Sequence, residues 1–264
     1  MNFIQPSIDP IIFSIGYIDI RWYSMAYIIG LILGLILIKK LNKAKGGLIS
    51  VNKLDNFFIW AVMGTILGGR IGYVIFYQTT QIIVNPIYII QIWNGGMSFH
   101  GGLIGVILST YIYCKINKIN FLYLSDLVST VAPIGLFLGR VANFINSELI
   151  GKTTDFYISI IFPTIDNLPR HPSQLYEAFF EGIILFILLN FYFYKNINSK
   201  KYGNISGLFL IFYSTFRFFI EFLREPDSHI GLLFNFFSMG QLLSLPLFIF
   251  GIILVLKNAN HKSN

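Results

Sequence analysis

The chain carries six arginines, and each of them lies within or beside a long apolar run. A guanidinium group stays charged at any accessible pH, and its planar fork of N–H donors fits the oxygens of a phosphate or a carboxylate. A charge at membrane depth is costly and marks a pairing or a substrate site. Pairing with a carboxylate for helix packing is the simpler interpretation of any single arginine. The six together favour an anionic substrate group, and they are Arg21, Arg70, Arg140, Arg170, Arg217 and Arg224.

Four polar residues in one apolar run follow a helical spacing of four, four and three residues. Side chains at this spacing share one helix face, and at membrane depth that face should point into the helix bundle and not into lipid. Within the stripe, Glu221 can orient and partly neutralise Arg217. The four residues are Tyr213, Arg217, Glu221 and Arg224.

A histidine begins another apolar run, in the glycine-rich segment Gly95–Gly105. Glycines leave room for a substrate, and the pair Gly101 and Gly105 is a pattern by which membrane helices pack closely. A lone histidine is more often structural than catalytic. Histidine is nevertheless the side chain best suited to moving protons near neutral pH, so His100 is a candidate general base.

A third group of polar residues occupies residues 139–151. If this segment begins as a helix, Arg140 and Asn143 share a face. The side-chain amides of Asn143 and Asn146 can hydrogen-bond a phosphate or a glycerol hydroxyl without adding charge. We therefore interpret the segment as part of a headgroup site.

Residues 170–177 introduce the next apolar run. Pro172 at a first helical position, followed by Glu177 and Glu181 in the opening turns, is typical of a helix N-terminus. For this stretch a structural interpretation is at least as good as a functional one.

The elements that position these residues must be membrane helices. Hydrophobic residues make up 55% of the chain and charged residues 12%, with a mean hydropathy of +0.68. A soluble domain has about 25% charged residues, so soluble globular and disordered classes are excluded. The single cysteine, Cys114, excludes an internal disulfide and a multi-cysteine metal site. Continuous apolar runs disfavour a barrel, whose strands alternate.

Seven apolar runs approach the about 20 residues that a helix needs to cross a bilayer. We predict an all-α membrane protein in which residues 1–264 form one polytopic domain. Residues 139–172 would form a small extramembrane cap between the fourth and fifth spans. The predicted spans are Arg21–Ile38, Phe57–Phe76, Ser98–Cys114, Leu122–Leu138, Ser173–Tyr194, Gly207–Leu223 and Met239–Leu256.

The lysines predict the orientation, because cytoplasmic loops carry an excess of basic residues. Lysines follow the first, third, fifth and seventh spans, whereas residues 77–97 between the second and third spans contain no basic residue. We therefore predict a periplasmic N-terminus and a cytoplasmic C-terminus, which places every arginine in the outer half. The net charge of +7 then reflects topology and not a nucleic-acid surface. The lysines are Lys39, Lys40, Lys43, Lys45, Lys53, Lys115, Lys118, Lys195, Lys200, Lys201, Lys257 and Lys262.

These motifs resemble the characteristic blocks of the prolipoprotein diacylglyceryl transferase family. The resemblance extends from about residue 22 to residue 246 and is most specific at residues 139–151. The chain departs from the family pattern at Ser24 and Ser147, where glycine is expected, and at Ile150, where tryptophan is common. The resembling blocks are residues 21–23, 68–73, 100–105, 139–151, 170–177, 217–227 and 238–241.

The resemblance implies a seven-span enzyme of the bacterial inner membrane with its active site toward the outer leaflet. It would transfer the diacylglyceryl group of phosphatidylglycerol to the thiol of the lipobox cysteine of a preprolipoprotein. Glycerol phosphate would be released. No metal, redox cofactor or nucleic acid is implied, and the nucleophile belongs to the protein substrate.

The residue chemistry fits such a reaction, because a free thiol with a pKa of about 8.5 needs a base or a nearby cation to react at neutral pH. We expect His100 to take the thiol proton and Tyr23 to position the reacting groups, with Glu148 as an alternative base. Arg140 and Arg217 are expected to bind the phosphodiester and to stabilise the departing phosphate. The predicted headgroup-binding and orienting residues are Arg70, Arg140, Asn143, Asn146, Glu148, Gly151, Tyr213, Glu221 and Arg224.

Two other classes fit part of the pattern. A transporter or flippase for an anionic solute would also carry intramembrane arginines, but such proteins often show repeated halves, and no repeat is visible here. A noncatalytic lipid-binding partner of the secretion machinery would need the arginines but not His100.

Overall fold

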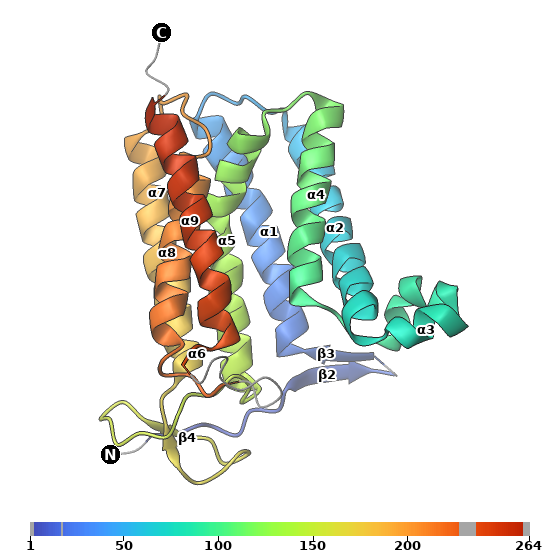
Figure 1. The fold of residues 1–264 in the computed structure, drawn as a ribbon, viewed down its shortest axis with the longest axis vertical. Helices are drawn as coiled ribbons and strands as arrows, with labels where there is room; N and C mark the ends of the chain where they lie inside the picture. Colours follow the sequence, from blue (N-terminus) through green and yellow to red (C-terminus); the bar gives the residue numbers. More distant parts are fainter. Residues whose placement is uncertain (1–2, 17, 227–235, 261–264) are drawn as a thin grey trace. The chain divides into compact units, whose positions relative to one another are not determined.

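The computed structural model describes residues 3–16, 18–226 and 236–260, and most of them are helical (Figure 1). Each of the seven predicted spans is a helix. Asp227, in one predicted motif, and Lys262, among the predicted cytoplasmic lysines, lie outside the described residues. The helices that match the predicted spans are α1 (Trp22–Ala44), α2 (Val51–Tyr77), α4 (Phe99–Asn117), α5 (Phe121–Ile145), the continuous run α6 (Ser173–Glu177), η3 (Ala178–Ile184) and α7 (Leu185–Lys195), α8 (Asn204–Ile220), and α9 (Met239–Asn260).

Five of the described helical runs are long and apolar enough to cross a membrane, so the chain has the build of a multi-pass membrane protein. Helix α8 is also apolar but has only 17 residues. The count of seven spans and the orientation of the termini stay predictions. The five runs are Trp22–Ala44, Val51–Tyr77, Phe121–Ile145, Ser173–Lys195 and Met239–Lys257.

The chain divides into two compact units, which are described separately. The smaller unit is Ile38–Ser125, and the larger unit combines Met1–Leu37 with Asp126–Asn264. Helices α1 and α5 contribute residues to both.

In the smaller unit, α2 and α4 pack along a line of glycines. A Cβ atom added at Gly72 would lie 2.7 Å from the Cα of Gly101, and one added at Gly68 would lie 2.7 Å from the Cα of Gly105. Backbones this close leave no room for side chains. The predicted packing role of Gly101 and Gly105 is confirmed. Between the two helices the chain forms α3 (Thr79–Val84) and the 3₁₀ turns η1 (Pro86–Ile90) and η2 (Ile92–Asn94).

In the larger unit, α8 and α9 lie side by side and antiparallel (Figure 1). Their backbones are close: a Cβ added at Gly207 would lie 2.8 Å from Val255, and one added at Gly251 would lie 2.9 Å from Ile211. Asp126 of α5 fixes the start of α8. Its carboxylate accepts hydrogen bonds from the backbone N–H of Gly203 at 2.7 Å and from the N–H and hydroxyl of Ser206, both at 2.8 Å. These bonds satisfy N–H groups that have no partner within the helix.

Short strands accompany the loops of the larger unit. A hairpin of β2 (Ile11–Ile15) and β3 (Ile18–Arg21) leads into α1, and β1 (Phe3–Ile4) pairs with β4 (Ile160–Ile161), which pairs with β5 (Pro169–Arg170). These strands were not predicted from the sequence. The fourth predicted span ends at Leu138, whereas α5 continues to Ile145, so the first residues of the predicted cap are helical.

Candidate active site

The extension of α5 places Arg140 on a helix, beside two acidic residues of the run Ser173–Lys195. Its Nε lies 3.1 Å from Glu177 Oε2 and its Nη2 lies 3.3 Å from Glu181 Oε2. Both carboxylates have side chains that are 0% exposed. A π-helical turn begins directly after Glu177, an irregularity that is frequent at functional sites. Arg140 is thus held at two points by fully buried carboxylates.

Arg217 of α8 reaches the same carboxylate from another side. Its Nη1 donates to Glu177 Oε1, and its Nη2 lies 2.8 Å from Glu221 Oε2, so the predicted pairing of Arg217 with Glu221 is confirmed. The Nη1 of Arg224 lies 3.8 Å from Glu221 Oε2 and 4.0 Å from Glu177 Oε1. Helix α8 ends at Ile220, so the predicted single helical stripe is wrong in its last part: Glu221 caps the helix, and Arg224 lies beyond it in a β-bridge to Gly151.

We call these six residues the arginine–glutamate cluster. Three guanidinium groups face three carboxylates, and the arginine side chains are between 6% and 15% exposed. Groups of this kind are buried only when they are paired. The cluster consists of Arg140, Arg217, Arg224, Glu177, Glu181 and Glu221.

Main-chain hydrogen bonds bring three of the sequence motifs side by side. The N–H of Gly151 donates to the carbonyl of His171 at 3.1 Å, and the N–H of Lys152 donates to the carbonyl of Leu223 at 2.9 Å. A Cβ atom at residue 151 would lie 2.7 Å from the Cβ of His171, which explains the glycine. Residues 150–152, 171 and 223–225 therefore form one connected wall.

Glu148 lies in the tight turn that follows α5. Its carboxylate accepts hydrogen bonds from the side-chain amides of Asn143 at 2.9 Å and Asn146 at 3.2 Å. The flanking residues Ser147 and Leu149 both have φ of 56°, in the left-handed region. That region favours glycine, which is the residue expected from the family pattern at 147. Two side-chain amides therefore orient Glu148, one of the predicted headgroup-binding and orienting residues.

The start of the run Ser173–Lys195 supports the same turn. The hydroxyl of Ser173 donates to the carbonyl of Leu149 at 2.8 Å, and the amide of Gln174 donates to the carbonyl of Glu148 at 2.5 Å. Both side chains are fully buried. This segment is therefore part of the site's framework, beyond its role as a helix start.

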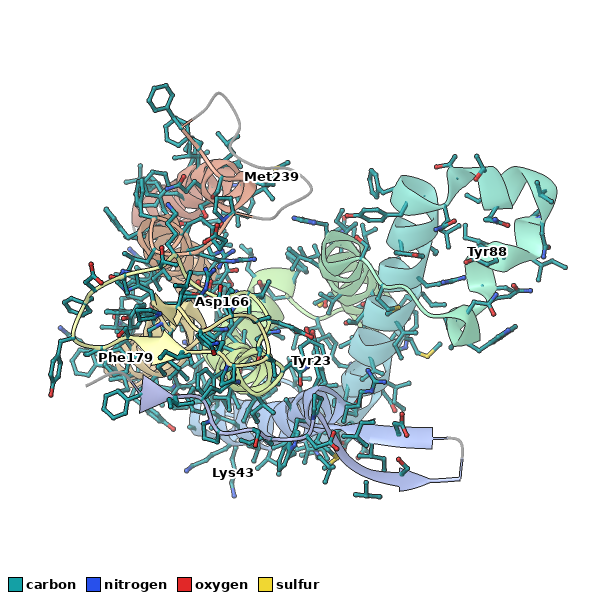
Figure 2. All side chains as sticks on the ribbon, turned by 90° about the horizontal axis from the view of Figure 1, so that it is seen from below. Tyr23, Lys43, Tyr88, Asp166, Phe179 and Met239 are labelled. Carbon is teal, nitrogen blue, oxygen red and sulfur yellow. The ribbon has the colours of Figure 1, made fainter. Side chains whose placement is uncertain are left out.

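Two tyrosines complete the predicted site within the larger unit. The hydroxyl of Tyr23 (labelled in Figure 2) lies 3.3 Å from that of Tyr27 and interacts electrostatically with Glu148 and Arg140. Tyr213 stacks on Phe209 and interacts electrostatically with Arg140. Both predicted tyrosines thus share a neighbourhood with Arg140.

The loop before the run Ser173–Lys195 contains a separate ion pair. The Nη2 of Arg170 lies 2.6 Å from Asp166 Oδ2, and its Nη1 donates to the carbonyl of Gly151 at 3.1 Å. Hydrogen bonds from Arg170 lower the pKa of Asp166, and burial lowers the pKa of His171. Arg170 fastens the loop to the wall that contains Gly151.

The smaller unit holds the remaining two predicted residues. His100 is exposed in the first turn of α4, where Ser98 caps the helix by accepting from the N–H of Gly101 at 3.2 Å. Arg70 is 1% exposed: its Nη2 donates to the carbonyl of Tyr88 at 2.9 Å, its Nη1 donates to the carbonyl of Gly95, and its guanidinium lies 4.7 Å from the centre of the Tyr88 ring. Figure 2 labels Tyr88 on the segment that Arg70 ties to α2.

Sequence reasoning missed Glu177 and Glu181 as site residues. Two acids in the first turns of a helix look like complements to the helix dipole. The number of arginines could have indicated these two residues, because arginines inside membrane helices require carboxylate partners. The predicted spans contain few acids: Asp126, Glu177, Glu181 and Glu221.

The apolar helices and the buried charge cluster define a multi-pass membrane protein with an arginine-rich site inside its helices. A sequence model of the prolipoprotein diacylglyceryl transferase family matches residues 10–257. The chain therefore belongs to this family of transferases.

Similar proteins from three Rickettsia species bear the name phosphatidylglycerol–prolipoprotein diacylglyceryl transferase. The R. bellii protein (strain OSU 85-389) is 50% identical over 252 residues, 96% of each chain. The R. typhi protein is 50% identical over 252 residues, 96% of this chain and 97% of its own. The R. felis protein is 49% identical over 250 residues, 95% of this chain and 96% of its own.

Proposed function

We propose that this protein transfers the diacylglyceryl group of phosphatidylglycerol to the thiol of a preprolipoprotein lipobox cysteine, the first step of lipoprotein maturation. The observation that carries the proposal is the arginine–glutamate cluster, because it concentrates phosphate-binding groups within apolar helices of a chain that belongs to this transferase family. The names of its relatives state both substrates, phosphatidylglycerol and a prolipoprotein.

The reaction exchanges one bond at a glyceryl carbon. The sulfur of the substrate thiol forms a thioether bond to that carbon as the carbon–oxygen bond to phosphate breaks, and the thiol proton passes to a base. Glycerol phosphate leaves with an additional negative charge on its oxygen. Arg140 and Arg217 would hold the phosphodiester and stabilise that charge, which is the electrostatic part of the catalysis.

Proton transfer is assigned to His100, with Glu148 as the alternative base and Tyr23 positioning the reacting groups. Histidine suits this role near neutral pH. Two amide hydrogen bonds hold the carboxylate of Glu148 in place. Transfer activity measured across a pH series in His100→Asn, Glu148→Gln and the wild type distinguishes the two candidate bases. The variant whose activity no longer rises with pH identifies the base.

The remaining predicted residues would bind or orient the headgroup. Asn143 lies on α5 and Asn146 in the turn after it, whereas Gly151 and Arg224 belong to the wall. Tyr213 lies on α8, and Glu221 caps that helix. In the smaller unit Arg70 would act by holding residues 88–95 in place, because it donates hydrogen bonds to the carbonyls of Tyr88 and Gly95.

The membrane topology is part of the proposal: seven spans in the bacterial inner membrane, a periplasmic N-terminus, a cytoplasmic C-terminus, one membrane domain and a periplasmic cap at residues 139–172. The larger unit supports the orientation. Gly207, near the start of α8, contacts Val255 near the end of α9, so Lys200, Lys201 and Lys257 lie toward one end of this helix pair. At the other end a Cβ at Gly240 would lie 2.8 Å from Glu221 in the cluster. Lysines at one end and arginines at the other fit an active site toward the outer leaflet.

The deciding experiment incubates the purified protein with radiolabelled phosphatidylglycerol and a lipobox peptide. Label on the peptide cysteine, with release of glycerol phosphate, is the expected result. Movement of the labelled lipid between the two leaflets of proteoliposomes, with no label on the peptide, would instead indicate a flippase. Absence of transfer in every detergent and lipid mixture would overturn the proposal.

A further inference from the structure

We propose that Glu177 is a positioning residue of the transfer reaction, a shared counter-ion that sets the spacing of the two phosphate-binding arginines. The inference rests on the proposed function and extends it to a residue outside the predicted site. It follows from the geometry of a single carboxylate.

Each oxygen of Glu177 holds an arginine from a different helix. Oε2 lies 3.1 Å from the Nε of Arg140 on α5, and Oε1 accepts from the Nη1 of Arg217 on α8. Arg224 approaches the same Oε1 at 4.0 Å. The side chain of Glu177 is 0% exposed, so water does not compete for these contacts.

This arrangement counters a repulsion. Arg140 and Arg217 carry like charges, and both contact one small carboxylate, so their guanidinium groups are close neighbours. Like charges repel strongly where water is largely absent. The negative charge of Glu177 between them allows both groups to present their remaining N–H donors to one anionic group. Without it, the two guanidinium groups would separate or recruit another anion.

The neighbouring acids give an internal comparison. Glu181 contacts Arg140 at 3.3 Å, and Glu221 contacts Arg217 at 2.8 Å, whereas Glu177 contacts both arginines. If spacing is the function, neutralising Glu177 should cost more than neutralising Glu181. If any buried negative charge suffices, the two losses should be equal.

The test measures kcat and KM for phosphatidylglycerol in Glu177→Gln, Glu181→Gln and the control Asp55→Asn. The Asp55 side chain is 46% exposed and pairs with Lys39 outside the candidate site, so its variant should stay within about two-fold of wild type. We expect kcat/KM to fall by roughly 100-fold or more in Glu177→Gln, mainly through kcat, and by about 10-fold in Glu181→Gln.

A double-mutant cycle separates positioning from a general loss of structure. If Glu177 acts through the arginines, Glu177→Gln should cost much less activity when Arg140 is already lysine, because the spacing is lost in that background. Fully additive losses would overturn the inference, as would equal losses in the Glu177 and Glu181 variants.

A conservative variant keeps the inference testable if Glu177→Gln does not fold. Glu177→Asp retains the charge but shortens the side chain, so it reaches one arginine at a time, and it should fold with reduced kcat. Wild-type kcat in this variant would overturn the positioning role. Failure of the wild-type protein to transfer lipid would refute the proposed function instead, so the two failures are distinguishable.

Discussion

Replacing Arg140 by lysine tests whether the site depends on the fork of a guanidinium or only on its charge. Arg140 uses two different nitrogens, at 3.1 Å from Glu177 and 3.3 Å from Glu181. Lysine keeps the positive charge but has one nitrogen, on a point-like ammonium group. It can hold one of the two carboxylates at a time, and it cannot bind two phosphate oxygens in parallel.

The expected loss follows from these contacts. A hydrogen bond to a charged group contributes about 1.5–3 kcal/mol, and the carboxylate that is left without its partner stays buried. If that energy is expressed in the transition state, it corresponds to a roughly 10- to 150-fold loss of kcat/KM. Because the charge itself remains, the loss should be smaller than that caused by Arg140→Ala.

The assay is transfer of labelled lipid from phosphatidylglycerol to a lipobox peptide at saturating peptide, with kcat and KM determined separately. Arg21→Lys is the matched control, because the Arg21 side chain is 60% exposed and its carboxylate partner lies 3.8 Å away. A melting curve for each variant separates activity from stability. A value of kcat/KM within about two-fold of wild type in Arg140→Lys would refute the reasoning from the fork.

Three further predictions concern the framework. Asp126→Asn should lower the free energy of unfolding by about 1–3 kcal/mol, because an amide cannot accept all the hydrogen bonds at the start of α8; an unchanged melting temperature would contradict this. Gly101→Ala should lower the melting temperature, since its Cβ would lie 2.9 Å from the Cα of Gly72 on α2 and still closer to the carbonyl oxygen of Gly68. Gly135→Ala meets nothing within 4 Å and serves as control, and equal effects of the two changes would argue against close helix packing. Arg170 lowers the pKa of Asp166, so this ion pair should stabilise the protein above the unfolded pKa of about 3.9 and lose its effect as the pH falls through the lowered pKa. Asp166→Asn should therefore reduce the melting temperature at pH about 7 but not at pH about 2. An equal reduction at both pH values would exclude the ion pair as the cause.

The positions of the helices could be predicted from the sequence because apolar runs of membrane length are long and continuous. Their ends were less predictable, since tertiary contacts decide them. Helix α8 begins at Asn204, where Asp126 from another helix satisfies its first N–H groups. The strands β4 and β5 are two residues each, and such short elements depend wholly on distant partners.

Within the site, the spacing of residues along the chain predicted a contact between near neighbours in sequence and missed the contacts between residues of different helices. The four-residue separation of Arg217 and Glu221 was sufficient to predict their contact. No spacing along the chain relates Glu177 to Arg140 and Arg217, which are 37 and 40 residues away in sequence. That convergence is visible only when the three helices are packed.

The wall at residues 150–152 also bears on how this protein can evolve. Its links to residues 171 and 223–225 are main-chain hydrogen bonds, including the one from the N–H of Glu225 to the carbonyl of Ile150 at 3.1 Å. Backbone groups are the same in nearly every residue type, so these bonds survive a change of side chain. The side chain of Ile150 can therefore change without loss of these bonds. Gly151 has no such freedom, because the Cβ of His171 occupies the space that any side chain there would need. Mutational drift in this part of the chain is thus tolerated at one position and forbidden at the next.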